Sequence, residues 1–264
     1  MSEILDQRVY FAVPDAIDDS GSVSGGNVYD RHVRAGLLDG GWDVRMLEFP
    51  DLAELPDLPG SLRPTLSGLP HGALVLLDGL LAVRQPDALI EQAGRLRIVV
   101  LAHMVASLLH ETGRAGDLVA SAEQERDALR AAQRVIATSN WTRSELVSRG
   151  LAEPHRVVVA HPGTDVAPAS VPSLSGGRVL CVGVIAAHKG QDLLVHALAR
   201  LTDIGDDWAC TFVGSLDRDA DFVADIRRDV EGAGLTDRVV FSGVLAGPAL
   251  AKAYSRADLV VVPS

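Results

Sequence analysis

Residues 178–194 read RVLCVGVIAAHKGQDLL, and this stretch carries the pattern that decides the fold. It opens with an apolar run, Arg178–Gly183, continues through a loop to Gly190, and passes into an amphipathic stretch, Asp192–Leu201. A short apolar run bounded by glycine is typical of a buried strand, and apolar residues spaced by three and four are typical of a helix. The stretch therefore predicts a strand, a loop and a helix, in that order.

The same alternation extends over most of the chain. Runs such as Val157–Val159 and Leu259–Val262 are apolar at successive positions, as expected for strands covered on both faces. Further strands are expected at Val9–Val13, Asp43–Phe49, Ala73–Leu77, Arg97–Ala102, Arg134–Thr138, Arg156–His161, Ala209–Val213 and Val239–Ser242. Further helices are expected at Val28–Leu38, Gln124–Gln133, Arg143–Arg149, Phe222–Glu231 and Pro248–Arg256. This order predicts an α/β fold with two Rossmann-like lobes built on parallel sheets.

One interruption predicts the division between the lobes. Residues 164–177 are rich in Pro, Ser, Ala and Gly and have little periodicity, which is typical of a linker. We therefore expect an N-terminal domain at residues 1–163, the linker at 164–177, and a second domain at 178–264. The second domain holds four expected strands and three expected helices before Val262-Pro263-Ser264, so we expect that lobe to be incomplete in this chain.

The composition fits a globular protein and excludes several kinds of partner. Hydrophobic residues make up 47% of the 264 residues and charged residues 22%, which is too apolar for a disordered chain. Its 24 basic and 35 acidic residues give a net charge of −11, so no footprint for nucleic acid is present. The sequence shows neither a signal peptide nor a long apolar span, so we expect a cytoplasmic location. Cys181 and Cys210 lie far apart, show no metal-binding spacing, and fit a reducing compartment.

Two candidate functional side chains follow expected strands. Lys189 is one of only two lysines among the 24 basic residues, and it precedes a helix, where a cation is unfavourable unless an anion neutralises it. A phosphate group there would satisfy both the lysine and the helix N–H groups. His103 follows Arg97–Ala102 at the edge where open α/β sheets bind ligands. The plain alternatives are a solvated lysine and a packed histidine.

A third candidate is the loop Pro14–Gly26, which is acidic, rich in Gly and Ser, and ends in Gly25-Gly26. Glycines let a backbone approach a ligand closely, and the helix that follows offers N–H groups to an anion. The alternative is a flexible loop with Asn27 as the N-cap of the helix. The fingerprint G-x-G-x-x-G is absent, which argues against a nicotinamide dehydrogenase.

The motifs occur in the order of a known family. Gly25-Gly26, with Tyr29–Leu38, Gly41 and Val44 after it, is similar to an opening GG…L…L…GHEV pattern. Leu180–Leu194 is similar to F-V-G-R-L-x-x-x-K-G-x-D-x-L-L. Further segments similar to the family are Ile136–Leu146, Val157–Asp165, Phe212–Ser215, Val239–Val244 and Ala257–Ser264. Seven segments in register resemble the family-4 retaining glycosyltransferases (glycosyltransferase group 1) of the GT-B architecture.

The resemblance implies two lobes that face each other across a cleft, and transfer of a hexosyl group from a nucleotide-diphosphate sugar to an acceptor with retention. Neither a metal nor another cofactor is implied. Gly25 and Gly26 would bring N–H groups to the donor diphosphate, and Lys189 would neutralise the charge on the leaving group. His103 matches the histidine that hydrogen-bonds the donor sugar. The other donor-binding residues implied by the resemblance are Gly183, Ser215, Val244 and Leu245.

The sequence also departs from the family pattern. Val184 stands where an arginine is usual, and Trp42 where a histidine is usual. The family's E-x7-E element, whose glutamates contact the donor sugar and ribose, would follow Pro263-Ser264. We therefore expect the chain to hold an acceptor lobe and about half of a donor lobe.

Two other functions remain as alternatives. One is a nucleotide-sugar 2-epimerase of the same architecture, and the other is a non-catalytic module that binds a sugar nucleotide or partners a catalytic subunit. The acceptor, whether a small molecule, a glycan or a lipid-linked molecule, would be selected by the irregular segments Pro50–Pro70 and Met104–Ser121. Met104–Ser121 could also touch a membrane surface, although a buried helix face is the preferred interpretation.

Overall fold

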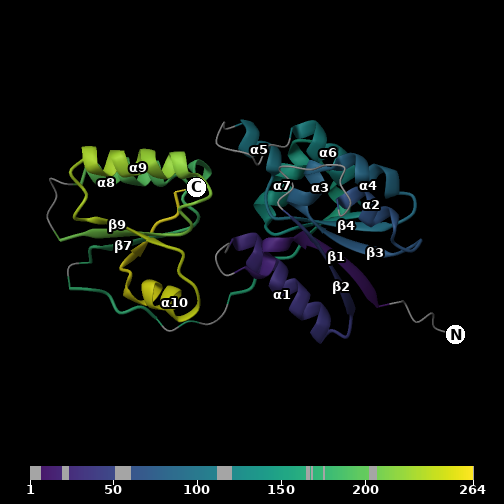
Figure 1. The fold of residues 1–264 in the computed structure, drawn as a ribbon, viewed down its shortest axis with the longest axis horizontal. Helices are drawn as coiled ribbons and strands as arrows, with labels where there is room; N and C mark the ends of the chain where they lie inside the picture. The colour runs from purple at the N-terminus through teal and green to yellow at the C-terminus, as the bar shows by residue number, and fades with distance from the viewer. Residues whose placement is uncertain are drawn as a thin grey trace. The chain divides into compact units, whose positions relative to one another are not determined.

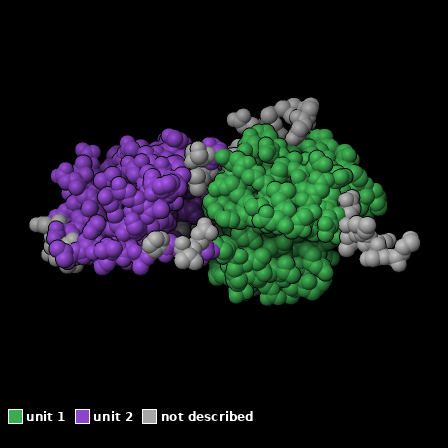
Figure 2. All heavy atoms as spheres, turned by 90° about the horizontal axis from the view of Figure 1, so that it is seen from below, with its two compact units in different colours: residues 1–18, 25–163 green, residues 19–24, 164–264 purple. Residues whose placement is uncertain are grey.

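The computed structural model describes residues 7–19, 24–50, 61–111, 121–164, 167, 169–174, 176–201 and 207–263. The chain divides into two compact units, coloured separately in Figure 2. The first unit comprises residues 1–18 and 25–163, and the second comprises residues 19–24 and 164–264. Each unit is built on one parallel sheet with helices on its faces (Figure 1).

The sheet of the first unit has the strand order β2-β1-β3-β4-β5-β6, and all its pairs are parallel. Its strands are β1 (Arg8–Pro14), β2 (Asp43–Phe49), β3 (Leu74–Asp78), β4 (Arg97–Ala102), β5 (Arg134–Ala137) and β6 (Val157–Val159). The chain adds β2 on one side of β1 and then returns to the other side to form β3. The strand order therefore reverses between β1 and β3, and ligands bind at such a point, outside the carboxyl ends of the strands.

Helices cover both faces of this first sheet. They are α1 (Gly25–Asp39), α2 (Leu62–Ser67), α3 (Gly79–Arg84), α4 (Pro86–Gln92), α5 (Ala106–Glu111), α6 (Ala122–Ala131) and α7 (Asn140–Ser148). Successive strand residues point to opposite faces, so Leu76 packs in the same cluster as α1, whereas Val75 and Leu77 pack in the cluster of α3, α4 and α6. Figure 1 shows α1 on one face and α3, α4 and α6 on the other.

The sheet of the second unit has the order β10-β7-β8-β9, again with parallel pairs. Its elements are β7 (Arg178–Val182), α8 (Gln191–Ala199), β8 (Ala209–Val213), α9 (Ala220–Gly232), β9 (Val239–Gly243), α10 (Gly247–Arg256) and β10 (Leu259–Val260). The faces alternate as before: Cys181 and Phe212 pack with α8 and α9, whereas Leu180 and Val213 pack with α10. The strand order reverses between β7 and β10.

The α/β class with parallel sheets is confirmed, and Asp43–Phe49, Arg97–Ala102 and Ala209–Val213 have the predicted bounds. Two local predictions were wrong. Helix α1 begins at Gly25, so Gly25 and Gly26 form its first turn rather than the end of a loop, and Asn27 lies inside the helix instead of capping it. Helix α2 lies within the segment Pro50–Pro70, which was expected to be irregular. Its proline, Pro64, does not prevent a helix, because it stands in the first turn, where N–H groups have no helical partner.

Parts of several predicted segments lie outside the described residues. They are residues 20–23 of the glycine-rich loop, 51–60 of the proline-rich segment, 112–120 of the proposed acceptor segment, 165, 166, 168 and 175 of the linker, and 264. Among the residues that the structure does describe, no helix has the length and apolar character needed to cross a membrane.

Candidate active site

The first group of candidate residues lies at the carboxyl ends of the strands of the first unit. His103 directly follows β4, as predicted, and Asp78 is the last residue of the neighbouring strand β3. Asp30, on α1, completes the group: its Oδ1 atom lies 3.0 Å from Nε2 of His103, and Oδ2 of Asp78 lies 3.3 Å from the same nitrogen. One imidazole thus contacts two carboxylates beside the reversal of the strand order.

All three side chains are withdrawn from solvent. The side chains of Asp30, Asp78 and His103 are 1%, 5% and 11% exposed. Burial by itself disfavours protonation of His103, but the close contacts with the negative charges of Asp30 and then Asp78 outweigh it and raise the pKa of His103 to about 10. His103 is therefore an imidazolium at neutral pH.

The two carboxylates are held differently. Oδ1 of Asp78 accepts hydrogen bonds from the backbone N–H groups of Leu80 and Leu81, at 2.8 and 3.2 Å, and so caps α3. Asp30 has no such cap, and burial raises the pKa of Asp30 against the opposing effect of His103. Neither Oδ1 of Asp30 nor Nε2 of His103 has an aligned hydrogen-bond partner in the described part of the chain, so their contact is an ion pair rather than a well-formed hydrogen bond.

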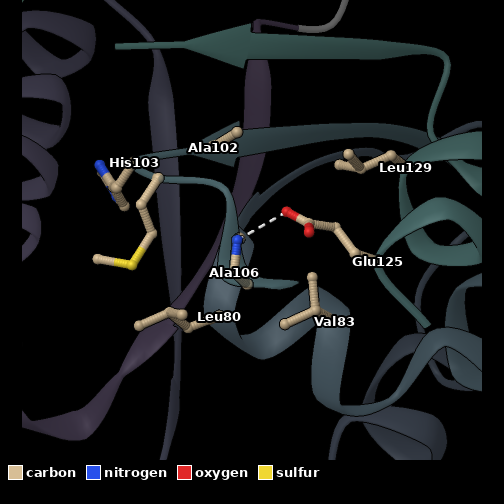
Figure 3. A pocket seen from close by; sticks show the side chains of 9 residues that line it. Leu80, Val83, Ala102, His103, Ala106, Glu125 and Leu129 are labelled. Atoms are coloured by element: carbon tan, nitrogen blue, oxygen red, sulfur yellow. Dashed lines mark hydrogen bonds between the residues drawn. The ribbon is translucent and has the colours of Figure 1, made fainter. Parts of the chain in front are cut away.

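Neighbouring residues fix the ring and line a small hollow beside it. The ring of Tyr29 meets the His103 ring edge-on at 5.3 Å, and Thr138 donates a hydrogen bond to the His103 carbonyl oxygen. Figure 3 shows the hollow, with Glu125 reaching from α6 toward the backbone of Ala106. Both oxygens of Glu125 accept N–H groups, from Ala106 at 2.8 Å and Ser107 at 2.9 Å, so Glu125 anchors the start of α5.

The same cluster has the donor types of a metal site. Ligand atoms of Asp30, Asp78 and His103 all lie within 4.8 Å of one another. A histidine that ligates a metal must be neutral, however, whereas the two carboxylates favour the protonated ring. Without a metal ion, the arrangement is an imidazolium ion-paired to two carboxylates.

The second group of candidate residues lies at the carboxyl ends of β7 and β8. Gly183 N donates to Val213 O at 2.8 Å, and Ile185 N donates to Ser215 O at 3.0 Å, so the two loops continue side by side beyond the sheet. A methyl group added at Gly214 would lie only 1.8 Å from the carbonyl oxygen of Gly183. Glycine at position 214 is therefore required by the close approach of the two backbones.

Lys189 lies over this loop pair. A Cβ atom added at Gly183 would lie 3.9 Å from Cδ of Lys189, so the aliphatic part of the lysine side chain passes across the glycine. Gly190 follows in the left-handed region, at φ 69°, and a Cβ there would be 3.2 Å from Pro263. Gly190, next to Lys189, and Pro263, after β10, therefore meet beside the reversal of strand order in the second sheet.

Lys189 is the one side-chain cation of residues 183–190 at neutral pH. Burial, and then the charge of Lys189, lower the pKa of His188, which leaves that ring neutral. Val184, at the place of the family's arginine, contributes only its carbonyl oxygen, which accepts a hydrogen bond from Nε2 of Gln191 at 2.8 Å. Lys189 forms no ion pair within the described parts of the chain, and its side chain is partly exposed.

The other predicted site residues lie on other elements. Val244 and Leu245 follow β9; Val244 is 36% exposed, and Leu245 packs toward α10. Gly25 and Gly26 begin α1, which also carries Asp30. The structure thus groups Gly183, Lys189 and Ser215 in the second unit, and His103 with the helix of Gly25 and Gly26 in the first.

Asp30 and Asp78 were missed by the sequence prediction. Asp78 has the same signal as His103, because it ends an apolar strand at the ligand-binding edge. Asp30 precedes Val33 and Leu37 by three and seven residues, so it lies on the helix face that those apolar residues turn to the sheet. An acidic residue on such a face is the signal that could have found it.

Comparison with known proteins identifies the class of the fold. Residues 176–264 match the family described as glycosyl transferases group 1, so the chain carries a glycosyl transferases group 1 domain in its second unit. Two solved structures share the fold over nearly the whole chain. Anabaena HepE in complex with UDP and glucose is 19% identical, with a TM-score of 0.62, over 97% of this chain and 73% of that chain. A sucrose-phosphate synthase from Thermosynechococcus elongatus is 22% identical, with a TM-score of 0.71, over 98% and 75%. The fold is that of the GT-B glycosyltransferases.

Curated relatives are glycosyltransferases as well. A 2-deoxystreptamine glucosyltransferase of Streptomyces kanamyceticus is 34% identical over 155 residues, which cover 53% of this chain and 39% of the relative. A D-inositol 3-phosphate glycosyltransferase of Paenarthrobacter aurescens is 32% identical over 175 residues, which cover 61% and 42%. The matched part of this chain thus spans well under half the length of these relatives.

Proposed function

We propose that this chain transfers a hexosyl group from a nucleotide-diphosphate sugar to an acceptor, with retention of the anomeric configuration. The observation that carries the proposal is Lys189, a partly exposed cation with no ion-pair partner in the described residues, placed over Gly183 where the strand order of the second sheet reverses. The group 1 domain and the relatives named as glycosyltransferases support the reaction class. Anabaena HepE has been crystallised with UDP-glucose, which supports the donor class.

The reaction is favoured by a cation beside the diphosphate leaving group. The bond between the sugar C1 and the diphosphate oxygen breaks, and its electron pair stays on the diphosphate. An acceptor hydroxyl oxygen bonds to C1 on the same face, and its proton passes to the leaving phosphate oxygen. The Lys189 ammonium stabilises the negative charge that develops on the diphosphate. Gly25 and Gly26, in the first turn of α1, stay predicted donor-binding residues through their backbone N–H groups.

The first unit contributes His103, which contacts the donor sugar. Asp30 is buried and its Oδ1 faces His103, so this proposal gives Asp30 no role as a nucleophile. Asp30, Asp78 and His103 act as an ion-paired group in this proposal and hold no metal. The proposal further assigns nucleotide contacts to Ser215, Val244 and Leu245. It includes a role in carbohydrate biosynthesis and a cytoplasmic location. The free thiols of Cys181 and Cys210 are buried, which fits a reducing compartment.

The test is release of nucleotide diphosphate from a panel of UDP-, GDP- and ADP-hexoses, with D-inositol 3-phosphate and 2-deoxystreptamine among the acceptors. We expect Lys189→Ala to lower turnover about 10²–10³-fold, the cost of removing one group that stabilises transition-state charge. Lys252→Ala, at the only other lysine, is the matched control and should keep its turnover. Equal turnover of Lys189→Ala and the wild type would refute the role of Lys189.

Retention is tested on the glycoside formed by whichever donor and acceptor of the panel react. The anomeric proton coupling in the NMR spectrum separates an α- from a β-glycoside, and we expect the configuration of the donor. An inverted product would refute retention, and binding of the donor without any turnover would favour the non-catalytic module.

A further inference from the structure

The contacts of His103 are directed to one ring nitrogen. Both carboxylates face Nε2, at 3.0 Å for Asp30 and 3.3 Å for Asp78, and neither engages Nδ1. Both carboxylates are buried, and the histidine is the most exposed of the three side chains. Nε2 is therefore the nitrogen that faces fixed negative charge, and neither carboxylate competes for Nδ1.

The carboxylates of Asp78 and Asp30 are stabilised by different groups. Two N–H groups at the start of α3 stabilise the Asp78 carboxylate whether or not His103 is charged. Within the part of the chain that the structure describes, Asp30 accepts no hydrogen bond from an N–H group, so its buried negative charge is stabilised chiefly by the imidazolium. A buried charge without a partner is costly, so Asp30 and the proton on His103 favour each other.

We propose that Asp30 and Asp78 are positioning residues that hold His103 as a fixed imidazolium, with Nε2 ion-paired to the two carboxylates and Nδ1–H donated to an oxygen of the nucleotide-diphosphate sugar. His103 then acts as a cationic hydrogen-bond donor and not as a general acid or base. The identity of the ligand rests on the proposed function, whereas the charge and orientation of the ring do not.

The other groups that face the ring agree with this assignment. Tyr29 and Asp30 face it from α1, Asp78 from β3, and Glu125 lines the same hollow from α6. In the described residues no lysine or arginine pairs with Asp30 or Asp78, so no other side-chain cation replaces the imidazolium. The charged groups around His103 are acidic and favour the protonated ring.

The test is histidine NMR of the chain labelled with ¹³C- and ¹⁵N-histidine, in which His103→Gln assigns the His103 signals. At pH 8 we expect both ring nitrogens of His103 to carry protons in the wild-type protein. In Asp30→Asn the ring should titrate lower by about 1–3 pH units, the effect of removing one opposite charge at close range. Asp39→Asn, on an exposed residue at the end of the same helix, is the control and should leave the titration unchanged.

The wild-type spectrum decides the proposal even if Asp30→Asn fails to fold. A neutral His103 at pH 8 overturns it, and so does a neutral, metal-bound ring that appears on adding one equivalent of Zn²⁺. An unchanged titration in folded Asp30→Asn overturns the role of Asp30.

A binding measurement separates this proposal from the proposed function. Asp30→Asn should bind UDP-glucose as the wild type does at pH 6 and more weakly, by up to about tenfold, at a pH above its own lowered titration midpoint, because a hydrogen bond from a charged donor is then lost. A merely structural role of Asp30 would weaken binding equally at both pH values and would contradict the proposal. An imidazolium with no binding of any nucleotide sugar would refute the proposed function and leave the positioning intact.

Discussion

His103 links the stability of the first unit to pH. Its folded-state pKa of about 10 lies above the ordinary value of 6.5, so protonation stabilises the fold. That stabilisation is complete below pH 6.5 and is lost as the pH rises through 10. Removing one partner of a buried ion pair costs about 3–5 kcal/mol, so we expect His103→Gln to lower the free energy of unfolding by about that amount at pH 6.

Urea unfolding of the wild type and His103→Gln between pH 6 and 10 measures this effect. The difference between the two proteins should shrink as the pH approaches 10. His32→Gln, on the exposed side of α1, is the control and should follow the wild type. A constant difference across this range would contradict the ion pair.

The positions of His103 and Lys189 after strands could be predicted from the sequence, because the carboxyl edge of a parallel sheet is where such folds bind ligands. Their roles in binding and catalysis stay predictions. The ion pair of His103 could not be found, because it depends on how α1 packs against the strands β3 and β4. Asp30 and His103 are distant in sequence, and only the folded chain brings them within 3.0 Å.

Single elements were predicted unevenly. Strands such as Asp43–Phe49 are marked by their own apolar runs, whereas α3, α4 and α5 have six or seven residues, too few for a helical period to be distinct. The start of α5 is also fixed from a distant segment, because Glu125 of α6 accepts its N–H groups. Such a long-range cap leaves no local pattern in the sequence.

At the scale of elements, a group of hydrogen bonds to Asp258 joins the segment before β7 to the second sheet. Asp258, just before β10, accepts hydrogen bonds from the Ser173 hydroxyl at 2.6 Å and from the Arg178 backbone at 2.8 Å. The hydrogen bonds from Ser173 and then Arg178 lower the pKa of Asp258 to about 2. Since the folded-state pKa is below the ordinary 3.8, the ionised carboxylate stabilises the fold above about pH 4, and this effect is lost as the pH falls through 2.

We therefore expect Asp258→Asn to have a lower Tm than the wild type at pH 7, with a difference that narrows between pH 4 and pH 2. Thermal unfolding across this range measures it. Asp237→Asn, an exposed aspartate in a turn of the same unit, is the control and should show neither effect. A difference that persists unchanged at pH 2.5 would mean that the carboxylate charge is not what joins these segments.

At the scale of the whole molecule, each unit reverses its strand order once, and each reversal lies beside the candidate residues of that unit. The net charge of −11 repels an anionic donor, so binding must depend on local groups such as Lys189 rather than on the overall field. Solved structures of the same fold match nearly all of this chain, so the shared fold covers both units.

The most direct test of this account is calorimetric titration of the chain with UDP-glucose and with a panel of other nucleotide-diphosphate hexoses, on the wild type, Lys189→Ala and Lys252→Ala. We predict that at least one donor binds the wild type and Lys252→Ala equally and binds Lys189→Ala at least about tenfold more weakly, the loss expected for one charged hydrogen bond. Equal affinity of Lys189→Ala, or no binding of any donor to the wild type, would contradict the assignment of the donor site.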